Sequence, residues 1–272
     1  MSDPRVSVVM GVYNDAEYVA KSVESILTQT YEEFEFVIID DGSTDNSSEL
    51  LQEYADQDDR ITLFRQSNSG LTKALNAGLA RADGKYIARM DADDIADQNR
   101  LERQVEFLEK NPEIVLVGTQ YTEVDADGNL LGRSDLPETD REIRDVLMKY
   151  NPFFHASVMM RAETVSSIGG YNASFKYSQD YDLWLRLAKE GELINLSSEL
   201  MKRRYDKTNI SVAKETTQRW VSIVIRMKAI KQYGYSPRNV RYLGRPLLVC
   251  IAPDRLLRVV RGYILRNKIY DR

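Results

Sequence analysis

The 272-residue sequence has little cysteine and no long hydrophobic run. Its single cysteine, Cys250, excludes an internal disulfide. The first residues lack the apolar run of a secretory signal, and no stretch reaches the roughly 18 uninterrupted apolar residues that a membrane-spanning helix needs. We therefore expect a cytoplasmic protein, and a peripheral position on the inner face of the cell membrane stays open.

Two familiar nucleotide-binding motifs are also missing. No Gly-x-Gly-x-x-Gly opens the first expected helix, and Gly-x-x-x-x-Gly-Lys-Ser/Thr occurs nowhere. Neither a dinucleotide-binding fold nor a phosphate loop is supported, so a metal ion would have to hold any bound phosphates. The sequence has one histidine, His155, beside Phe153 and Phe154. A lone histidine among aromatic residues is usually packed and hydrogen-bonded, and this interpretation stays open beside a functional one.

The net charge of −5 hides an asymmetry between the two ends of the chain. Residues 236–272 contain nine Lys or Arg and two acids, a balance of +7, and the rest of the chain carries −12. We expect no nucleic-acid partner. Within 254–270, apolar and basic residues fall on opposite faces of a predicted helix. This helix could contact an anionic membrane, its own domain or a second subunit of a homo-oligomer.

Short apolar segments alternate with helical patterns along the first 90 residues. Strands that alternate with helices imply parallel pairing and right-handed crossovers, so we expect an α/β, doubly wound, mostly parallel sheet. Ligands of such sheets bind at the carboxyl ends of the strands. The expected strands are 6–10, 34–39, 61–64 and 86–90; the expected helices are 16–30, 44–56 (capped by Ser43 or Thr44) and 71–82.

Further elements are expected in the rest of the chain. Val124–Leu130 superficially resembles the start of a calcium loop, but a hairpin turn at Asp127 and Gly128 explains it better. Residues 199–214 predict a strand followed by a polar segment that is either a lid over bound donor or a surface loop. The other expected elements are a helix over 99–108, a strand over 114–118, a helix within 134–147, a strand over 157–160 and a helix from about 216.

Three carboxylates directly follow the expected strand 86–90. Asp91, Asp93 and Asp94 lie so close in sequence that their like charges repel unless a cation lies beside them. Two carboxylates one residue apart can share Mg²⁺ or Mn²⁺, with substrate phosphates completing the coordination shell. A plain acidic turn that caps the helix starting near Asp97 is the alternative, and the isolated motif does not exclude it.

The order and spacing of eight short motifs resemble family 2 glycosyltransferases. The resemblance covers roughly residues 5–205. It implies a GT-A type fold, a nucleotide-diphosphate sugar donor, a divalent metal cofactor (Mn²⁺ or Mg²⁺) and inversion at the anomeric carbon. We expect a catalytic domain over 1–215 and a basic helical extension over 216–272. The motifs are Val6–Asn14, Ser25–Thr30, Ile39–Asp45, Asn76–Gly78, Ala82–Ile87, Asp91–Asp94, Asn151–His155 and Gln179–Arg186.

The resemblance also implies roles in binding the donor. Asp41 would hydrogen-bond the base, although Asp-Gly-Ser-Thr-Asp is also a good turn and helix cap. The family often has Arg where this chain has Leu75, so Lys73 and Arg65 are the candidates for a basic partner of the diphosphate. The remaining assignments are Val12 and Tyr13 at the base, Asp91 and Ala92 at the ribose, Asp91, Asp93 and His155 at the metal, and Asp94 beside them.

The motif at Gln179 supplies the expected catalytic base. Inverting transfer needs a group that removes the proton of the acceptor hydroxyl, and Asp180 matches the family's aspartate at this place. An ordinary helix N-cap is the alternative. Gln179 stands where the family commonly has Glu, Asp182 would orient its neighbours, and Trp184 would either pack in the core or form the floor of the acceptor site.

We therefore expect a metal-dependent inverting glycosyltransferase that moves a sugar from a nucleotide-diphosphate donor, with UDP-sugars favoured. The acceptor would be a hydroxyl of a glycan or lipid-linked saccharide of the cell surface. A nucleotidyltransferase is one alternative, but it normally has a Gly-rich basic loop after the first strand. A non-catalytic nucleotide-sugar-binding relative is the other, and it would lack the base or a metal ligand.

Overall fold

The computed structural model describes residues 5–205, 215–244 and 246–247; at residues 215 and 216 it describes the backbone only. The chain divides into two compact units, Met1–Asn209 and Ile210–Arg272, and each is described by itself.

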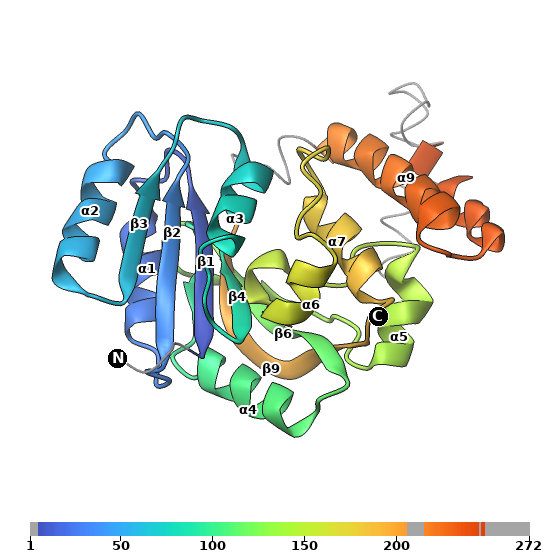
Figure 1. The fold of residues 1–272 in the computed structure, drawn as a ribbon, viewed down its shortest axis with the longest axis horizontal. Helices are drawn as coiled ribbons and strands as arrows, with labels where there is room; N and C mark the ends of the chain where they lie inside the picture. The colour runs from blue at the N-terminus through green and yellow to red at the C-terminus, as the bar shows by residue number, and fades with distance from the viewer. Residues whose placement is uncertain (1–4, 206–214, 245, 248–272) are drawn as a thin grey trace. The chain divides into compact units, whose positions relative to one another are not determined.

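The described part of the first unit is built on one nine-stranded sheet (Figure 1). Its first half is parallel, in the order β3-β2-β1-β4, as the alternation of strands and helices predicted. These strands are β1 (Val6–Val12), β2 (Phe34–Asp40), β3 (Ile61–Arg65) and β4 (Tyr86–Met90). The connecting helices are α1 (Val19–Leu27), α2 (Ser47–Gln57) and α3 (Leu71–Leu79).

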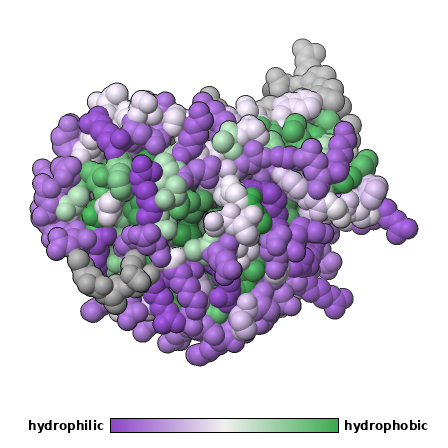
Figure 2. Space-filling view, in the orientation of Figure 1, coloured by the Kyte–Doolittle hydropathy of each residue, from purple (hydrophilic) through white to green (hydrophobic). Residues whose placement is uncertain are grey.

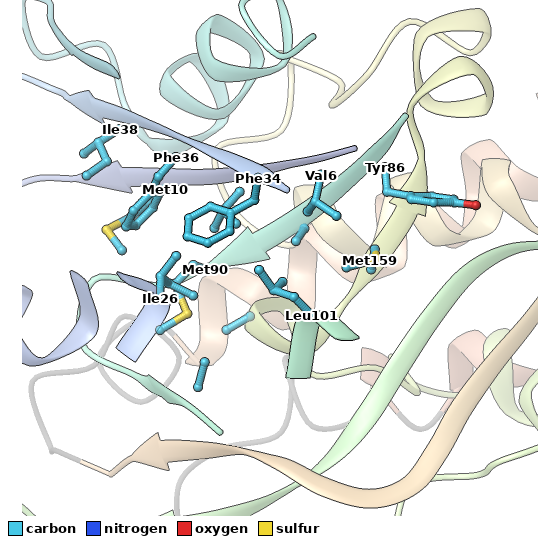
Figure 3. Packing of buried hydrophobic residues seen from close by; sticks show 14 of the residues in the cluster. Val6, Met10, Ile26, Phe34, Phe36, Ile38, Tyr86, Met90, Leu101 and Met159 are labelled. Carbon is cyan, nitrogen blue, oxygen red and sulfur yellow. The ribbon is translucent and has the colours of Figure 1, made fainter. Parts of the chain in front are cut away.

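The two faces of the parallel half are covered by different helices. Alternate strand residues pack with α1 and with α4 (Arg100–Lys110), and Figure 3 shows Ile26 of α1 and Leu101 of α4 near the side chains of β1, β2 and β4. On the opposite face, Ala74 of α3 packs on Val37 and Ile39 of β2. Gly78 allows α3 this approach, because a Cβ there would lie 2.5 Å from Cγ1 of Val9.

The second half of the sheet is mixed. β8 (Met159–Arg161) pairs antiparallel with β4 and β6 (Ile114–Val124), and β9 (Glu192–Arg204) pairs parallel with β6. The short β5 (Ile95–Ala96) pairs with the far end of β9, so the segment just after the three carboxylates is held by residues 201 and 202. The remaining elements are β7 (Leu130–Arg133), α5 (Asp140–Leu147), η1 (His155–Ser157), α6 (Ala162–Ser167) and α7 (Gln179–Leu187).

Two local predictions had different outcomes. The hairpin at Asp127 and Gly128 is confirmed, since β6 and β7 pair antiparallel around it and Gly128 has a φ of 88°. The cap predicted for the second helix was wrong. α2 begins at Ser47 with Asn46 as N-cap and no side-chain cap bond, because Ser43 and Thr44 bond Asn14 in the loop after β1.

The surface of the first unit is mostly hydrophilic in the view of Figure 2, with hydrophobic residues gathered over β2 and β3.

In the second unit, the described residues form α9 (Glu215–Gln232) and the 3₁₀ helix η2 (Pro237–Leu243), whose N-cap Ser236 accepts a bond from the Arg238 amide. No helix of the described ranges is long and apolar enough to cross a bilayer. Cys250, the predicted lid around 208–211 and the amphipathic helix of 254–270 lie outside the described residues.

One carboxylate oxygen of α4 binds residues at the starts of β1 and β4. Oε1 of Glu109 lies 2.6 Å from Nη2 of Arg5 and 2.7 Å from Nζ of Lys85, and it accepts a bond of 2.5 Å from the Tyr86 hydroxyl. The bonds from Arg5, Lys85 and Tyr86 lower the pKa of Glu109 to about 2. The ionised carboxylate therefore stabilises the folded state.

Glu109→Gln is expected to lower the free energy of unfolding by about 1 kcal/mol at neutral pH, a value discounted because the side chain is 32% exposed. The folded pKa lies below the ordinary value of 4.5. The contribution is thus present above about pH 4.5 and is lost as the pH falls towards 2. Urea unfolding at pH 7 and pH 3 measures it, with Glu106→Gln, an exposed residue of the same helix, as control. An equal difference between wild type and Glu109→Gln at both pH values would contradict the assignment.

Candidate active site

The ends of β1, β2 and β4 bring polar loops to one edge of the sheet. Val12 pairs with Asp40 and Met10 with Met90, so the loops that follow these strands are neighbours. Asn14 has a φ of 57°, and its side-chain oxygen accepts the Thr44 amide at 2.8 Å. Asparagine tolerates this left-handed conformation better than most residues. The bond fixes the first two loops to each other.

The residues predicted at the base differ in exposure. Tyr13 is 46% exposed, so its ring is available to a planar ligand, whereas the side chains of Val12 and Ala92 are buried. Asp41 is buried, and its carboxylate accepts bonds from the backbone amides of Ser69 and Gly70, at 3.0 and 2.7 Å. Asp41 therefore holds the loop before α3. Its contact with a base stays a prediction.

The carboxylates after β4 share their surroundings with a fourth acid, Asp15. Burial, followed by the charges of Asp91 and Asp15, raises the pKa of Asp93 to about 7. Burial, followed by Asp93 and Asp91, raises the pKa of Asp94 well above its usual value. Burial, together with the charge of Asp91, raises the pKa of Asp15 to about 6. The sequence analysis missed Asp15, although it too follows a strand end.

This donor set suits a hard divalent cation. Carboxylate oxygens are the ligands that Mg²⁺ and Mn²⁺ prefer, and the raised pKa values show negative charge that the protein itself leaves without full compensation. Among the described residues, no three His, Cys, Asp or Glu side chains form a ready-made metal site. Asp91 and Asp93 could hold the ion only if other ligands completed its shell.

Arg89 of β4 lies behind this cluster. The side chain is 1% exposed, and its Nη2 donates to Oδ1 of Asp91. Burial alone would raise the pKa of Asp91, but the charge and hydrogen bond of Arg89, together with electrostatic interactions with His155 and Arg203, outweigh burial, and the pKa falls below its usual value. The sequence analysis missed Arg89. The signal was available, because a charged residue within a buried strand requires a partner.

The end of β9 holds the acidic loop from the other side. The backbone amide of Arg204 donates to Oδ1 of Asp94 at 3.1 Å, and its Nε donates to the carbonyl oxygen of Asp93 at 3.2 Å. The guanidinium of Arg204 also lies 4.4 Å from the ring centre of Tyr18. Asp94 thus holds the acidic loop against the end of β9, and its place beside a metal site stays a prediction.

His155 lies in η1 and pairs with Tyr171. Its Nε2 is 2.7 Å from the Tyr171 hydroxyl. Burial, followed by the charge of Arg89, lowers the pKa of His155 to about 4, so the imidazole is neutral at neutral pH. Asp91 and Asp180 both act electrostatically on His155 and on Tyr171. These two carboxylates, 89 positions apart in the sequence, therefore both lie within electrostatic range of one pair of side chains.

Asp180 lies in the first turn of α7. The helix begins at Gln179, and its N-cap is Ser178, which has a φ of 55° and makes no side-chain cap bond. Asp180 is therefore not the N-cap. Its Oδ2 accepts a bond of 2.6 Å from Nδ2 of Asn151. The side chain is half-buried, whereas that of Gln179 is buried.

The next polar residues of α7 are internal. Asp182 is completely buried and lies 2.9 Å from Nε of Arg186, which donates to the carbonyl of Gly170 and so fixes the turn before Tyr171. Trp184 is also completely buried and packs edge-on against Phe153, with ring centres 5.7 Å apart. Trp184 thus offers no open face to an acceptor, and core packing is the alternative that the structure shows.

The two basic residues predicted for the diphosphate do not bond the acidic cluster within the described residues. Lys73 is exposed on α3. Arg65 donates to the carbonyl of Ser43 at 3.0 Å and lies 3.4 Å from Oδ2 of Asp40. Arg65 therefore holds the loop after β2, and within the described ranges neither Arg65 nor Lys73 bonds Asp91 or Asp93.

The sequence matches the model of glycosyl transferase family 2 over residues 7–176. A relative from Bacillus subtilis (strain 168), named "Putative glycosyltransferase EpsE", is 35% identical over 261 residues, which cover 94% of this chain and 92% of that protein. The family match includes the strand ends that carry Tyr13, Asp41 and Asp93.

Two solved structures share the fold at low sequence identity. S. aureus TarS 1–349, in complex with UDP-GlcNAc, has a TM-score of 0.72 and 17% identity over 91% of this chain and 73% of that chain. The mannosyltransferase PcManGT from Pyrobaculum calidifontis, in complex with GDP-Man and Mn²⁺, has a TM-score of 0.68 and 19% identity over 99% of this chain and 76% of that chain. The chain belongs to glycosyl transferase family 2, and it is a glycosyltransferase of the GT-A type.

Proposed function

We propose that the protein transfers a sugar, with inversion, from a nucleotide-diphosphate donor to a hydroxyl of a glycan or lipid-linked saccharide. The observation that carries the proposal is that Asp91, after β4, and Asp180, on α7, both lie within electrostatic range of the hydrogen-bonded pair His155 and Tyr171. An acidic cluster suited to a cation and a half-buried carboxylate thus share one region of the first unit, which we take as the catalytic domain. The basic second unit would be an extension of it.

The chain's own groups would divide the work as follows. Tyr13 is exposed beside the first strand end and would stack on the base. Asp91 and Asp93 would hold a divalent ion, and the bound ion would neutralise charge on the leaving nucleotide. Asp180 would accept the proton of the acceptor hydroxyl. At the same time the acceptor oxygen would attack the anomeric carbon, and the bond from that carbon to the diphosphate oxygen would break. Neutral His155 would fix the geometry between the two carboxylates.

A panel of donors tests this proposal. Purified protein is incubated with UDP-, GDP-, TDP- and CMP-sugars, with Mn²⁺ or Mg²⁺ and with EDTA, and nucleotide release is followed with and without saccharide acceptors. We expect release from one class of nucleoside-diphosphate sugar, UDP-sugars first, that EDTA abolishes. Binding of both UDP-GlcNAc by TarS and GDP-Man by PcManGT makes UDP and GDP the donors of first interest. Release that is unaffected by EDTA, or only from a CMP-sugar, would contradict the proposal.

A further inference from the structure

Arg89 has hydrogen-bonding capacity that its fold contacts leave unused. It is 1% exposed and bonds Asp91 through Nη2, but Nε and Nη1 have no hydrogen-bond partner among the described residues. Burying unpaired donors of a charged group costs free energy. Arg161, at the opposite end of the neighbouring strand β8, donates through Nε to Ile114 and through Nη2 to Leu108 and Asn111. Arg89 is thus a poor structural anchor by comparison.

The position of Arg89 places its charge under the candidate site. The charge acts on Asp91, on His155 and on Tyr171. The last two also feel Asp180. Arg89 is therefore bonded to one proposed metal ligand and lies within electrostatic range of the His155–Tyr171 pair, which the proposed function places between Asp91 and Asp180.

We propose that Arg89 is a positioning residue for the donor: it fixes the Asp91 carboxylate, and its buried charge offsets the acidic cluster so that an anionic diphosphate can bind there. The inference rests on the proposed function. It assigns to β4 the basic partner that sequence reasoning had assigned to Lys73 or Arg65.

The charges at the site predict opposite effects on its two ligands. Asp15, Asp91, Asp93 and Asp94 supply up to four negative charges, and the diphosphate of a nucleotide adds more. Removing the positive charge of Arg89 makes the site more negative. Electrostatics then predicts an equal or higher affinity for a cation alone and a lower affinity for the diphosphate. A merely structural role would weaken both together.

Binding measurements on three variants test the inference. Arg89→Gln keeps a donor for Asp91 without the charge, Arg89→Met is a second uncharged variant, and Arg89→Lys keeps the charge. Calorimetry gives Kd for MnCl₂ alone and for UDP and GDP with Mn²⁺ present. We expect both uncharged variants to bind the nucleotide about tenfold more weakly or worse, and Arg89→Gln, which still has a donor for Asp91, to keep Mn²⁺ affinity unchanged or tighter. Arg89→Lys is expected to stay within about threefold of wild type for both ligands.

Arg161→Gln is the matched control, because it removes guanidinium bonds of the same kind away from the acidic cluster. It is expected to lower Tm without changing either Kd. A folded uncharged Arg89 variant that binds nucleotide as wild type does would overturn the inference, as would Arg89→Gln if it loses Mn²⁺ and nucleotide affinity to the same extent. Failure of the wild-type protein to bind both UDP and GDP with Mn²⁺ would instead count against the proposed function.

Discussion

Asp180→Asn is expected to lower the rate of sugar transfer by a factor of about 10²–10⁴ while leaving donor binding intact. Asparagine has nearly the same shape as aspartate and keeps one side-chain oxygen. That oxygen can accept the bond that Nδ2 of Asn151 donates to Oδ2 of Asp180, at 2.6 Å, in the wild type. It cannot take the proton of an acceptor hydroxyl at neutral pH. The substitution therefore removes the proposed chemistry of the base without removing its contacts.

Steady-state kinetics with the donor found in the panel, together with calorimetric Kd for that donor, separates the two effects. The expected pattern is a fall in kcat with donor Kd within about threefold of wild type. Glu163→Gln makes the same chemical change in the first turn of α6, away from the carboxylate pair, and should leave both quantities as they are. Transfer by Asp180→Asn at the parent rate would show that another group is the base.

The parallel half of the sheet could be predicted because its signals are local. Each of its strands is a short apolar run, and each helix between them shows apolar residues at helical spacing. The acidic residues at strand ends followed from that topology, so Asp91 and Asp93 could be placed before any coordinates were known. Boundaries shifted by a few residues, as at α1, where the predicted 16–30 became Val19–Leu27.

The mixed half of the sheet could not be derived in the same way. Ala88 pairs with Met159 and Ile95 with Lys202, and no local pattern specifies pairings between residues so far apart. The contacts of Arg204 with the acidic loop and of His155 with Tyr171 depend on these pairings, so they too were missed. Arg89 was different. Its charge inside the run Tyr86–Met90 was visible in the sequence, but only the structure shows that Asp91 is its partner.

The second large effect is expected at Asp93. Asp93→Ala should remove the dependence of donor binding on metal, because it deletes one of the two carboxylates proposed to hold the ion. The affinity for Mn²⁺ is expected to fall about 100-fold or more, and nucleotide affinity measured with Mn²⁺ should fall to the value that wild type shows in EDTA. Asp127→Ala, in the exposed β6–β7 turn, changes the charge equally and should leave Mn²⁺ affinity as it is.

The stability of Asp93→Ala in EDTA provides an independent check on the same residue. Burial, followed by the like charges of Asp91 and Asp15, raises the pKa of Asp93, so its ionised carboxylate opposes folding when no cation is present. The variant should therefore unfold at a Tm equal to or above that of wild type in EDTA, and added Mn²⁺ should raise the Tm of wild type alone. A variant that is less stable than wild type in EDTA would show that Asp93 supports the fold, and its loss of metal binding would then say nothing about coordination. A variant that is stable and still binds donor in a metal-dependent way would exclude Asp93 as a ligand.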